Sequence, residues 1–378
     1  MSMSTRKAVG LELTMVLGMD SVHICGRVSG IYGPVPDERI LRNIFRDAEP
    51  AKIDILTQST EGCTFRARFE RNRSYLSHVR DVDVRLERAG GKCRIVAVLQ
   101  QLAYGQLPEL VPGTYAFGTA TAEDGLEVDF WVTEHVRDAV LLESIWQELD
   151  DNARSRLVCL VVDAVKKLQQ LDMDAKRTRY ELWTTPYMDF LSGVRAARDR
   201  RRPTSRVRTC EDGLEGIDVT SAVPDLVPVN ISRSELTSLQ EQVVLCHNDL
   251  EPRNILVQRG RAGHGYKLAA IVGWDKAGFF PFAYEYCVKD ALLGSENSSF
   301  SWYALFKQQT ACLVPRDSAN TRLIRAMNLI YQSRKVASTS LGALAQDKWI
   351  QRRGLARHPD VRVGWTRPAD GKPPKDIQ

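Results

Sequence analysis

One short stretch constrains this chain more than any other: residues 247–254 read His-Asn-Asp-Leu-Glu-Pro-Arg-Asn. The apolar residues 255–257 follow directly, and a second apolar segment ends in Gly273-Trp274-Asp275. An Asp and an Asn five residues apart on one tight loop can face the same phosphoryl group, the Asp as proton acceptor and the Asn as a Mg²⁺ ligand. The spacing therefore predicts a loop that acts on a phosphoryl group and a short strand that returns to it.

The segments LCHNDLEPRNILV (residues 245–257) and AAIVGWDKAGFFPFAYEY (residues 269–286) carry a family resemblance. They resemble the catalytic loop and metal strand of the aminoglycoside phosphotransferase and choline kinase-like family, especially its fungal branch. The resemblance implies an α+β, two-lobed protein-kinase-like fold, with a small N-terminal antiparallel sheet lobe containing one helix and a larger, mainly helical C-terminal lobe. It also implies transfer of the γ-phosphoryl of ATP, with Mg²⁺, to a small-molecule hydroxyl.

The resemblance assigns a role to each polar loop residue. Asp249 is expected to orient and deprotonate the acceptor hydroxyl, Asn254 to hold Mg²⁺, and His247 to brace the loop by hydrogen bonding. The alternative is structural: Asp249 caps a turn and Asn254 bonds its own backbone, as such residues often do.

Two positions depart from the family pattern. Gly273 stands where the family has the metal-binding Asp, and Ile95 stands where it has the Glu that orients a phosphate-binding cation. Asp275 is the nearest substitute ligand, since two residues along an extended strand return a side chain to the same face. The alternative function is a pseudokinase that binds a nucleotide or another ligand without turnover.

The N-terminal part predicts a nucleotide-binding lobe. Residues 52–57 and 64–70 read as a β-hairpin, and its turn has the small residues Ser59, Thr60 and Gly62 with which to cover phosphates. An ordinary turn is the alternative. Arg85, on the candidate strand 82–86, takes the place of the family's phosphate-binding cation; a solvated strand arginine is the other interpretation.

A hinge for the adenine base is predicted further along. Residues 92–105 form an apolar-faced helix, and the strand 128–136 would present main-chain groups at Glu134 and Val136 to adenine. A plain edge strand is the alternative. Leu157, Val161, Val165 and Leu168 then mark the buried face of a long helix over residues 151–171.

The predicted domain organisation has four parts: an N-terminal extension (1–50), an N-lobe (51–136), a C-lobe (137–350) with an acceptor-site insertion (172–240), and a basic, Pro-rich, disordered tail (351–378). Arginines gather in the insertion, at positions 195, 198, 200, 201, 202, 206 and 208. This cluster could bind an anionic substrate or an acidic surface, but a solvated charged segment is the more common outcome. The aromatic residues of 283–335 are expected to be mainly core.

Composition favours a small-molecule partner. Net charge is +5, from 52 basic and 47 acidic side chains, so we expect no obligate nucleic-acid binding; binding of an acidic partner through the arginine cluster is a third, weaker hypothesis. The eight cysteines form no C-x-x-C pair, which is typical of reduced thiols rather than a zinc module or a disulfide scaffold. No run of about 18 uncharged apolar residues is present, so the expected location is the cytoplasm, without membrane contact.

Overall fold

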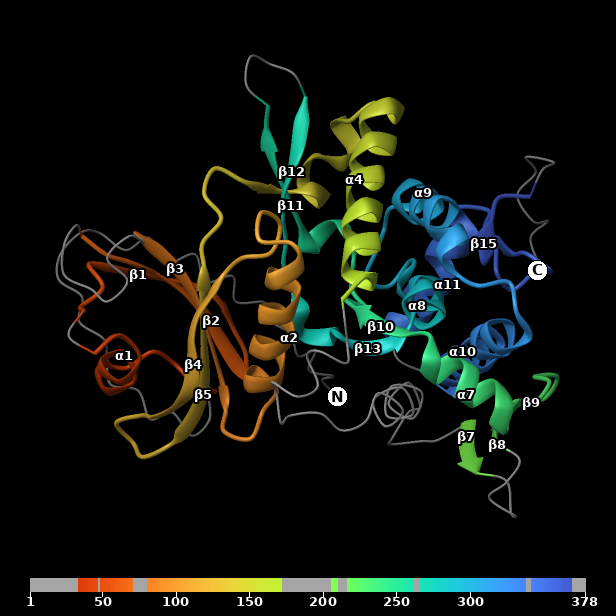
Figure 1. Cartoon of the computed structure of the whole chain (residues 1–378), viewed down its shortest axis with the longest axis horizontal. Helices are drawn as coiled ribbons and strands as arrows, with labels where there is room; N and C mark the ends of the chain where they lie inside the picture. Colours follow the sequence, from red (N-terminus) through yellow and green to blue (C-terminus); the bar gives the residue numbers. More distant parts are fainter. Residues whose placement is uncertain are drawn as a thin grey trace, which may run out of the picture.

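The computed structural model describes residues 33–46, 48–70, 80–171, 205–209, 216–260, 265–337 and 341–368. A small lobe built on a β-sheet lies beside a larger, mainly helical lobe (Figure 1). The α+β, two-lobed fold predicted from the sequence is confirmed.

The small lobe is built on five antiparallel strands in the order β1-β2-β3-β5-β4. Their bounds are β1 (Lys52–Gln58), β2 (Gly62–Arg68), β3 (Asp81–Arg88), β4 (Thr114–Thr121) and β5 (Glu127–Glu134). Alternate residues of β2 and β3 are buried, as expected when one face of a sheet covers a core. The predicted hairpin is therefore β1–β2.

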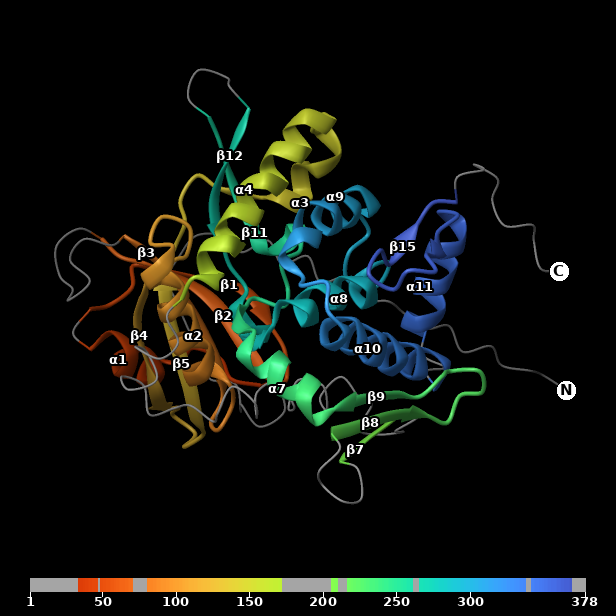
Figure 2. The same ribbon diagram turned by 45° about the vertical axis from the view of Figure 1, so that its right-hand side comes forward.

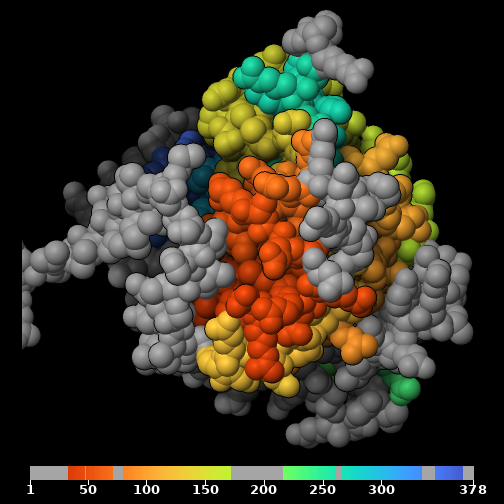
Figure 3. All heavy atoms as spheres, turned by 90° about the vertical axis from the view of Figure 1, so that its left-hand side faces the viewer, coloured from red at the N-terminus to blue at the C-terminus, as the bar shows by residue number. Residues whose placement is uncertain are grey.

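Two helices flank this sheet, where the sequence predicted one. Helix α1 (Glu38–Phe45) begins at Asp37, whose carboxylate accepts the N–H of Ile40 (2.7 Å), and it buries Ile40, Ile44 and Phe45 in a core shared with β2 and β3. The expected extension 1–50 thus includes residues of the small lobe's core, and we propose that this lobe starts by residue 33. Its outer surface, red to orange, fills the centre of Figure 3.

Helix α2 (Cys93–Gln106) flanks the sheet of the small lobe and faces the large lobe. Its apolar residues belong to the same core as those of α4 and α8. Residues 135–139 join β5 to the large lobe. The helices there are α3 (Leu142–Ile145), η1 (Trp146–Glu148), α4 (Asp151–Gln169), α7 (Arg233–Glu241), α8 (Phe282–Leu292), α9 (Phe300–Thr310), η5 (Ala311–Leu313), α10 (Ser318–Ala337) and α11 (Leu341–Arg352). The predicted apolar stripe of α4 is buried.

Short strands carry the loop of residues 247–254. It leaves β10 (Val243–Cys246), which pairs with β13 (Gly278–Pro281), passes through the 3-10 turn η2 (Pro252–Asn254) and enters β11 (Ile255–Arg259). Strand β11 pairs with β12 (Tyr266–Ile271) and with β6 (Val140–Leu141). The 3-10 turn η4 (Trp274–Lys276) follows β12, so two strand pairs fix the ends of the loop.

Part of the predicted insertion 172–240 has regular secondary structure. It contains an antiparallel sheet of β7 (Ser205–Thr209), β8 (Gly216–Ser221) and β9 (Val229–Ser232), followed by α7. A capping box starts α7, in which Ser232 bonds the N–H of Glu235 and Glu235 bonds the N–H of Ser232. This Ser-x-x-Glu signal was readable in the sequence. Arginines 195 to 202 lie outside the described residues.

The prediction of a disordered tail is wrong for residues 351–368. Helix α11 is followed by the antiparallel pair β14 (Ala356–Arg357) and β15 (Trp365–Thr366), which lies against α8 and α9 (Figure 2). The carboxylate of Asp290, buried in α8, accepts a hydrogen bond from Arg357 (3.0 Å), and its main-chain oxygen accepts one from the Trp365 indole (3.0 Å). A buried carboxylate needs such partners, so the basic residues that suggested disorder serve packing.

None of the helices in the described residues is both long and apolar enough to cross a membrane. The described aromatic residues of 283–335 are mostly core, as expected: Tyr284, Tyr286, Trp302, Tyr303 and Phe306 are buried.

Candidate functional site

His247, which is fully buried, fixes the loop of residues 247–254 through the two nitrogens of its ring. Its Nε2 lies 2.9 Å from the main-chain oxygen of Val272, and its Nδ1 accepts the N–H of Asp249 (3.2 Å), so the neutral ring with hydrogen on Nε2 satisfies both contacts. Burial lowers the pKa of His247 to about 4. The ring therefore fixes the loop to the segment after β12 and is no proton carrier at neutral pH.

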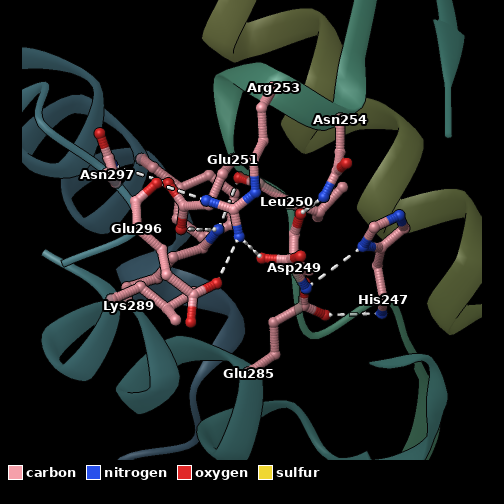
Figure 4. A network of polar contacts seen from close by, with 12 residues as sticks. His247, Asp249, Leu250, Glu251, Arg253, Asn254, Glu285, Lys289, Glu296 and Asn297 are labelled. Carbon is pink, nitrogen blue, oxygen red and sulfur yellow. Dashed lines mark hydrogen bonds and ion pairs between the residues drawn. The ribbon is translucent and has the colours of Figure 1, made fainter. Parts of the chain in front are cut away.

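Asp249 points its carboxylate towards two cations. The Arg253 guanidinium donates to Oδ1 (2.6 Å) and the Lys276 ammonium lies 3.5 Å from Oδ2. Burial favours the neutral acid, but Lys276 and Arg253 outweigh it and hold the pKa of Asp249 below its ordinary value. Figure 4 shows Arg253 reaching this carboxylate. Asp249 is thus an ionised, largely buried group held between two cations.

Asn254 is oriented by the same loop. Its Nδ2 donates to the main-chain oxygen of Asp249 (2.8 Å), so Oδ1 points the other way, towards Gly273. Gly273 has φ of +78°, and a Cβ added there would lie 2.4 Å from Asn254 Oδ1. The present Asn254 rotamer and a side chain at position 273 therefore exclude each other. Glycine at this position keeps the amide oxygen accessible.

The predicted substitution of Asp275 for a ligand at position 273 needed both residues to lie on one extended strand. The structure has no such strand at these positions. Strand β12 ends at Ile271, Gly273 is left-handed, and Asp275 lies in the 3-10 turn η4. Its Oδ1 instead forms an ion pair with the guanidinium of Arg85, on β3 of the small lobe. The two lobes are thus linked by an ion pair between the predicted phosphate-binding cation and the predicted metal ligand.

Glu87, two residues along the same strand, takes the other contact of Arg85 (Nη2–Oε1, 2.7 Å). Ile95, at the family's Glu position, is 55% exposed. The orienting carboxylate for the cation therefore comes from β3 rather than from α2. This substitution was readable as an Arg-x-Glu pair in one strand, since side chains two apart share a face.

In the turn between β1 and β2, most main-chain N–H groups donate hydrogen bonds within the turn itself. Ser59 N–H bonds the Gly62 oxygen (2.8 Å), and the N–H groups of Glu61 and Gly62 bond Ser59 Oγ (3.3 and 3.2 Å). Gly62 is needed because a Cβ there would lie 2.6 Å from the Leu86 oxygen. Among the main-chain N–H groups of this turn, Thr60 alone has no partner in the described chain.

The predicted hinge leads out of β5. The N–H of Glu134 bonds the Gly113 oxygen (2.8 Å), and the Glu134 carboxylate accepts the Gly113 N–H (3.2 Å). The N–H of Val136, which is half-buried, bonds no group of the described chain. Backbone donors of this kind are what an adenine ring would use.

Several site residues were not predicted from the sequence, and most of their partners are distant in the chain. The buried Glu251 carboxylate pairs with Lys289 (2.8 Å) and accepts from Asn297 (2.7 Å). Glu285, also buried, accepts the His247 N–H (3.1 Å), and burial raises its pKa to about 7. Arg253, Lys276 and Glu296 form the third unforeseen group around Asp249.

The structure brings together Asp249, Asn254 and His247 on one loop, and Arg85 with Asp275 beside it. The model of the phosphotransferase enzyme family matches residues 69–296, more than half of the chain. The chain belongs to this phosphotransferase family. The match begins at the end of β2 and ends after α8, so it spans the small lobe's sheet from β3 onward, the loop of residues 247–254 and the strand pair β11–β12 after it.

The chain is similar, at low identity, to solved phosphotransferases. One is an aminoglycoside phosphotransferase in its GDP and kanamycin complex, 16% identical over 83% of this chain and 94% of that chain, with a TM-score of 0.45. Another is macrolide 2'-phosphotransferase MphH from Brachybacterium faecium, 15% identical over 85% and 94%, with a TM-score of 0.35. No curated protein sequence matches the chain.

Proposed function

We propose that the chain is an ATP-dependent phosphotransferase that moves the γ-phosphoryl to a hydroxyl of a small molecule. The observation that carries the proposal is the pairing on one braced loop of Asp249, an ionised carboxylate, with Asn254, whose amide oxygen lies beside Gly273. These are the proton acceptor and the metal ligand that phosphoryl transfer requires. The cytoplasm is the proposed setting, in keeping with the free thiols of the described cysteines.

The nucleotide would bind between the lobes. Val136 and Glu134 offer main-chain groups to the base, Arg85 a cation to the phosphates, and the turn at Ser59, Thr60 and Gly62 a cover with one unused N–H. This arrangement requires Arg85 to leave Asp275 when phosphates bind, since one guanidinium cannot keep its present ion pairs and also hold the phosphates. Release of Asp275 would then make its carboxylate accessible.

The residues present fit a Mg²⁺ ion that arrives with the nucleotide. Mg²⁺ in such sites uses one or two carboxylates, water and substrate phosphates rather than a complete protein cage. Asn254 Oδ1 and the Asp275 carboxylate would hold it, and the described part of the chain has no group of three or more acidic, His or Cys residues arranged to hold a metal ion by itself. Bound there, Mg²⁺ would neutralise phosphate charge. Asp249 would accept the hydroxyl proton, while His247 keeps the loop in place.

Calorimetry of ATP binding with and without Mg²⁺ tests this function. Tighter binding with Mg²⁺ is expected, and Asp275→Ala should remove the metal effect by taking away the carboxylate. Asp54→Ala is the matched control, because Asp54 lies on β1 and pairs with Lys52 (2.7 Å). ATP binding that ignores Mg²⁺ in the unmodified chain would refute metal-dependent transfer.

A pseudokinase is the second candidate, and two observations favour it. Gly273 supplies no carboxylate, and both oxygens of Asp249 lie against cations. ATP binding without ADP release, across cationic, neutral and anionic acceptors, would establish this alternative.

A further inference from the structure

Arg253, Lys276 and Glu296 form a network with Asp249 at the mouth of the site. The loop contributes Asp249 and Arg253, the turn η4 contributes Lys276, and the turn between α8 and α9 contributes Glu296. Arg253 Nη2 lies 2.6 Å from Asp249 Oδ1, and Lys276 Nζ lies 3.5 Å from Asp249 Oδ2. A carboxylate with a cation at each oxygen is well held but poorly placed to accept a proton, because the proton would compete with both cations.

The same two cations also share a second carboxylate. Glu296 Oε2 lies 2.7 Å from Arg253 Nη2 and 3.0 Å from Lys276 Nζ, as Figure 4 shows for Arg253. Arg253 and Lys276 are thus already spaced to hold an anion beside Asp249. Two negative and two positive charges balance in this network.

The backbone of Glu296 is held independently of its side-chain ion pairs. Its N–H bonds the Leu292 oxygen (2.9 Å) and its oxygen accepts from Arg253 Nη1, whereas its side chain is 47% exposed. The carboxylate can therefore rotate into water while the turn stays in place. Losing the two ion pairs of the Glu296 carboxylate has a small effect, because ion pairs this exposed change an equilibrium constant only about 1.4- to 5-fold each.

We propose that the acceptor carries its own anionic group, a phosphate or a carboxylate, which binds Arg253 and Lys276 in place of the Glu296 carboxylate. The proposal rests on the phosphotransferase function above and narrows its substrate class. An anionic acceptor restores the charge balance that Glu296 now provides. A cationic acceptor would meet two positive side chains instead and would gain nothing from displacing Glu296.

The acceptor anion would also prepare Asp249. When Lys276 turns to the acceptor, Asp249 Oδ2 is released and can take the hydroxyl proton. The acceptor oxygen then forms a bond to the γ-phosphorus, the bond from that phosphorus to the β–γ bridging oxygen breaks, and its electron pair leaves with ADP. The proton passes from Asp249 to water, so one phosphoester and one proton are formed for each ATP used.

Matched acceptors test the substrate class in the full chain with Mg²⁺ and ATP, with ADP release as the measurement. Glycerol is compared with glycerol 3-phosphate, glucose with glucose 6-phosphate, and choline serves as a cationic alcohol. We expect kcat/KM for the anionic member of a pair to exceed that of the neutral member by about 10-fold or more, as charge-assisted hydrogen bonds provide. Equal or higher values for neutral or cationic acceptors would overturn the proposal.

Variants then connect the preference to the two cations. Lys276→Gln should lower the anionic-to-neutral ratio of kcat/KM, because Arg253 alone then contacts the anion, and Glu296→Gln should raise it. Lys267→Gln is the matched control, an exposed lysine on β12 outside the site. Two results together would show that Lys276 serves the nucleotide and that the proposal is wrong. The anionic-to-neutral ratio of kcat/KM would be unchanged in Lys276→Gln, and this variant would have lost more affinity for ATP than for ADP.

Binding of inorganic phosphate, measured by calorimetry, decides the anion site even if no acceptor is turned over. Glu296→Gln should tighten phosphate binding by roughly 2- to 10-fold, because one competing carboxylate is removed, and Lys276→Gln should weaken it by about 10-fold or more. Equal phosphate binding in the unmodified chain and both variants would refute the anion site. Absence of both Mg²⁺-dependent ATP binding and ADP release would instead refute the phosphotransferase function, while the phosphate result still stands.

Discussion

At the scale of single residues, Asp249 is defined by opposing effects. Its burial favours the neutral acid, and the two cations beside it favour the carboxylate and prevail. A group in this balance is ionised at neutral pH. Its chemistry therefore depends on which cations remain beside it when substrate binds.

Asp249→Asn should lower turnover by about 10²- to 10⁴-fold, the range for a positioned base. ATP affinity should stay nearly unchanged, because the nucleotide is proposed to contact Arg85 and the hinge. Steady-state ADP release and ATP calorimetry measure the two quantities. Asp163→Asn, on the exposed side of α4, is the control. A parallel loss of ATP affinity would assign Asp249 a structural role.

Glu285 adds a pH dependence to stability. Burial raises its pKa to about 7 from an ordinary 4.5, so the folded state keeps a proton that the unfolded chain loses first. The contribution of this proton to the stability of the fold is complete below about pH 4.5 and is lost as the pH rises towards 7. Buried His247 has the opposite sign, since its pKa is lowered to about 4, and its contribution is lost as pH falls below 6.5.

The variant Glu285→Gln should not lose this stability at higher pH, because glutamine does not ionise. The free energy of unfolding of the variant minus that of the unmodified chain should rise between pH 5 and 7.5 by on the order of 3 kcal/mol. The subtraction cancels the contribution of His247. Urea unfolding at both pH values measures it, and a flat difference would show that the Glu285 carboxyl is ionised when folded.

At the scale of elements, the segment after α11 shows how a glycine allows close docking. Gly364 has φ of +80°, and a Cβ there would lie 2.2 Å from the Tyr303 hydroxyl oxygen. That hydroxyl donates to Asp290 (2.6 Å) and accepts the Trp365 N–H (2.7 Å). Gly354 also has a positive φ, +61°, but open space around it.

The two glycines make a matched pair of variants. Gly354→Ala should destabilise by about 1–2 kcal/mol, the cost of a left-handed residue with a side chain. Gly364→Ala should cost about 1–3 kcal/mol more, because Tyr303 must move as well. Urea unfolding gives both values. Equal losses would mean that residues 356–366 do not dock on α8 as described.

At the scale of the whole molecule, Arg85 links the lobes where the nucleotide phosphates are proposed to bind. Its ion pair with Asp275 joins β3 of the small lobe to the turn after β12 in the large lobe. The same side chain therefore stabilises the closed arrangement and would bind phosphate when nucleotide enters. Affinity for ATP then includes the loss of this contact.

Arg85→Met should weaken ATP binding by about 10-fold or more, the size expected for a lost charged hydrogen bond, and Arg85→Lys should recover part of it. Arg68→Met is the control, since Arg68 lies on β2 and pairs with Asp81 (2.9 Å). Calorimetry measures the affinities. Unchanged affinity in Arg85→Met would restrict Arg85 to joining the lobes.

The sequence alone determined what depends on nearby residues. The loop of residues 247–254, the β1–β2 hairpin and the buried stripe of α4 follow from local spacing, because a turn, a strand and a helix each repeat over a few residues. The family and the two-lobed fold followed from the same loop and the metal strand after it. The capping box of α7 was equally local and could have been read.

The tertiary structure alone decided which side chains meet. Arg85 and Asp275 are 190 positions apart and Arg253 and Glu296 are 43 apart, so no spacing rule predicts either contact. The left-handed Gly273 and the turn after it redirected Asp275 from the predicted strand face towards Arg85. The basic tail is ordered over residues 351–368, where Arg357 pairs with Asp290, a residue buried in α8 that also pairs with Lys307 of α9. Long-range charge pairing depends on the assembled core, and only the folded chain brings these groups within bonding distance.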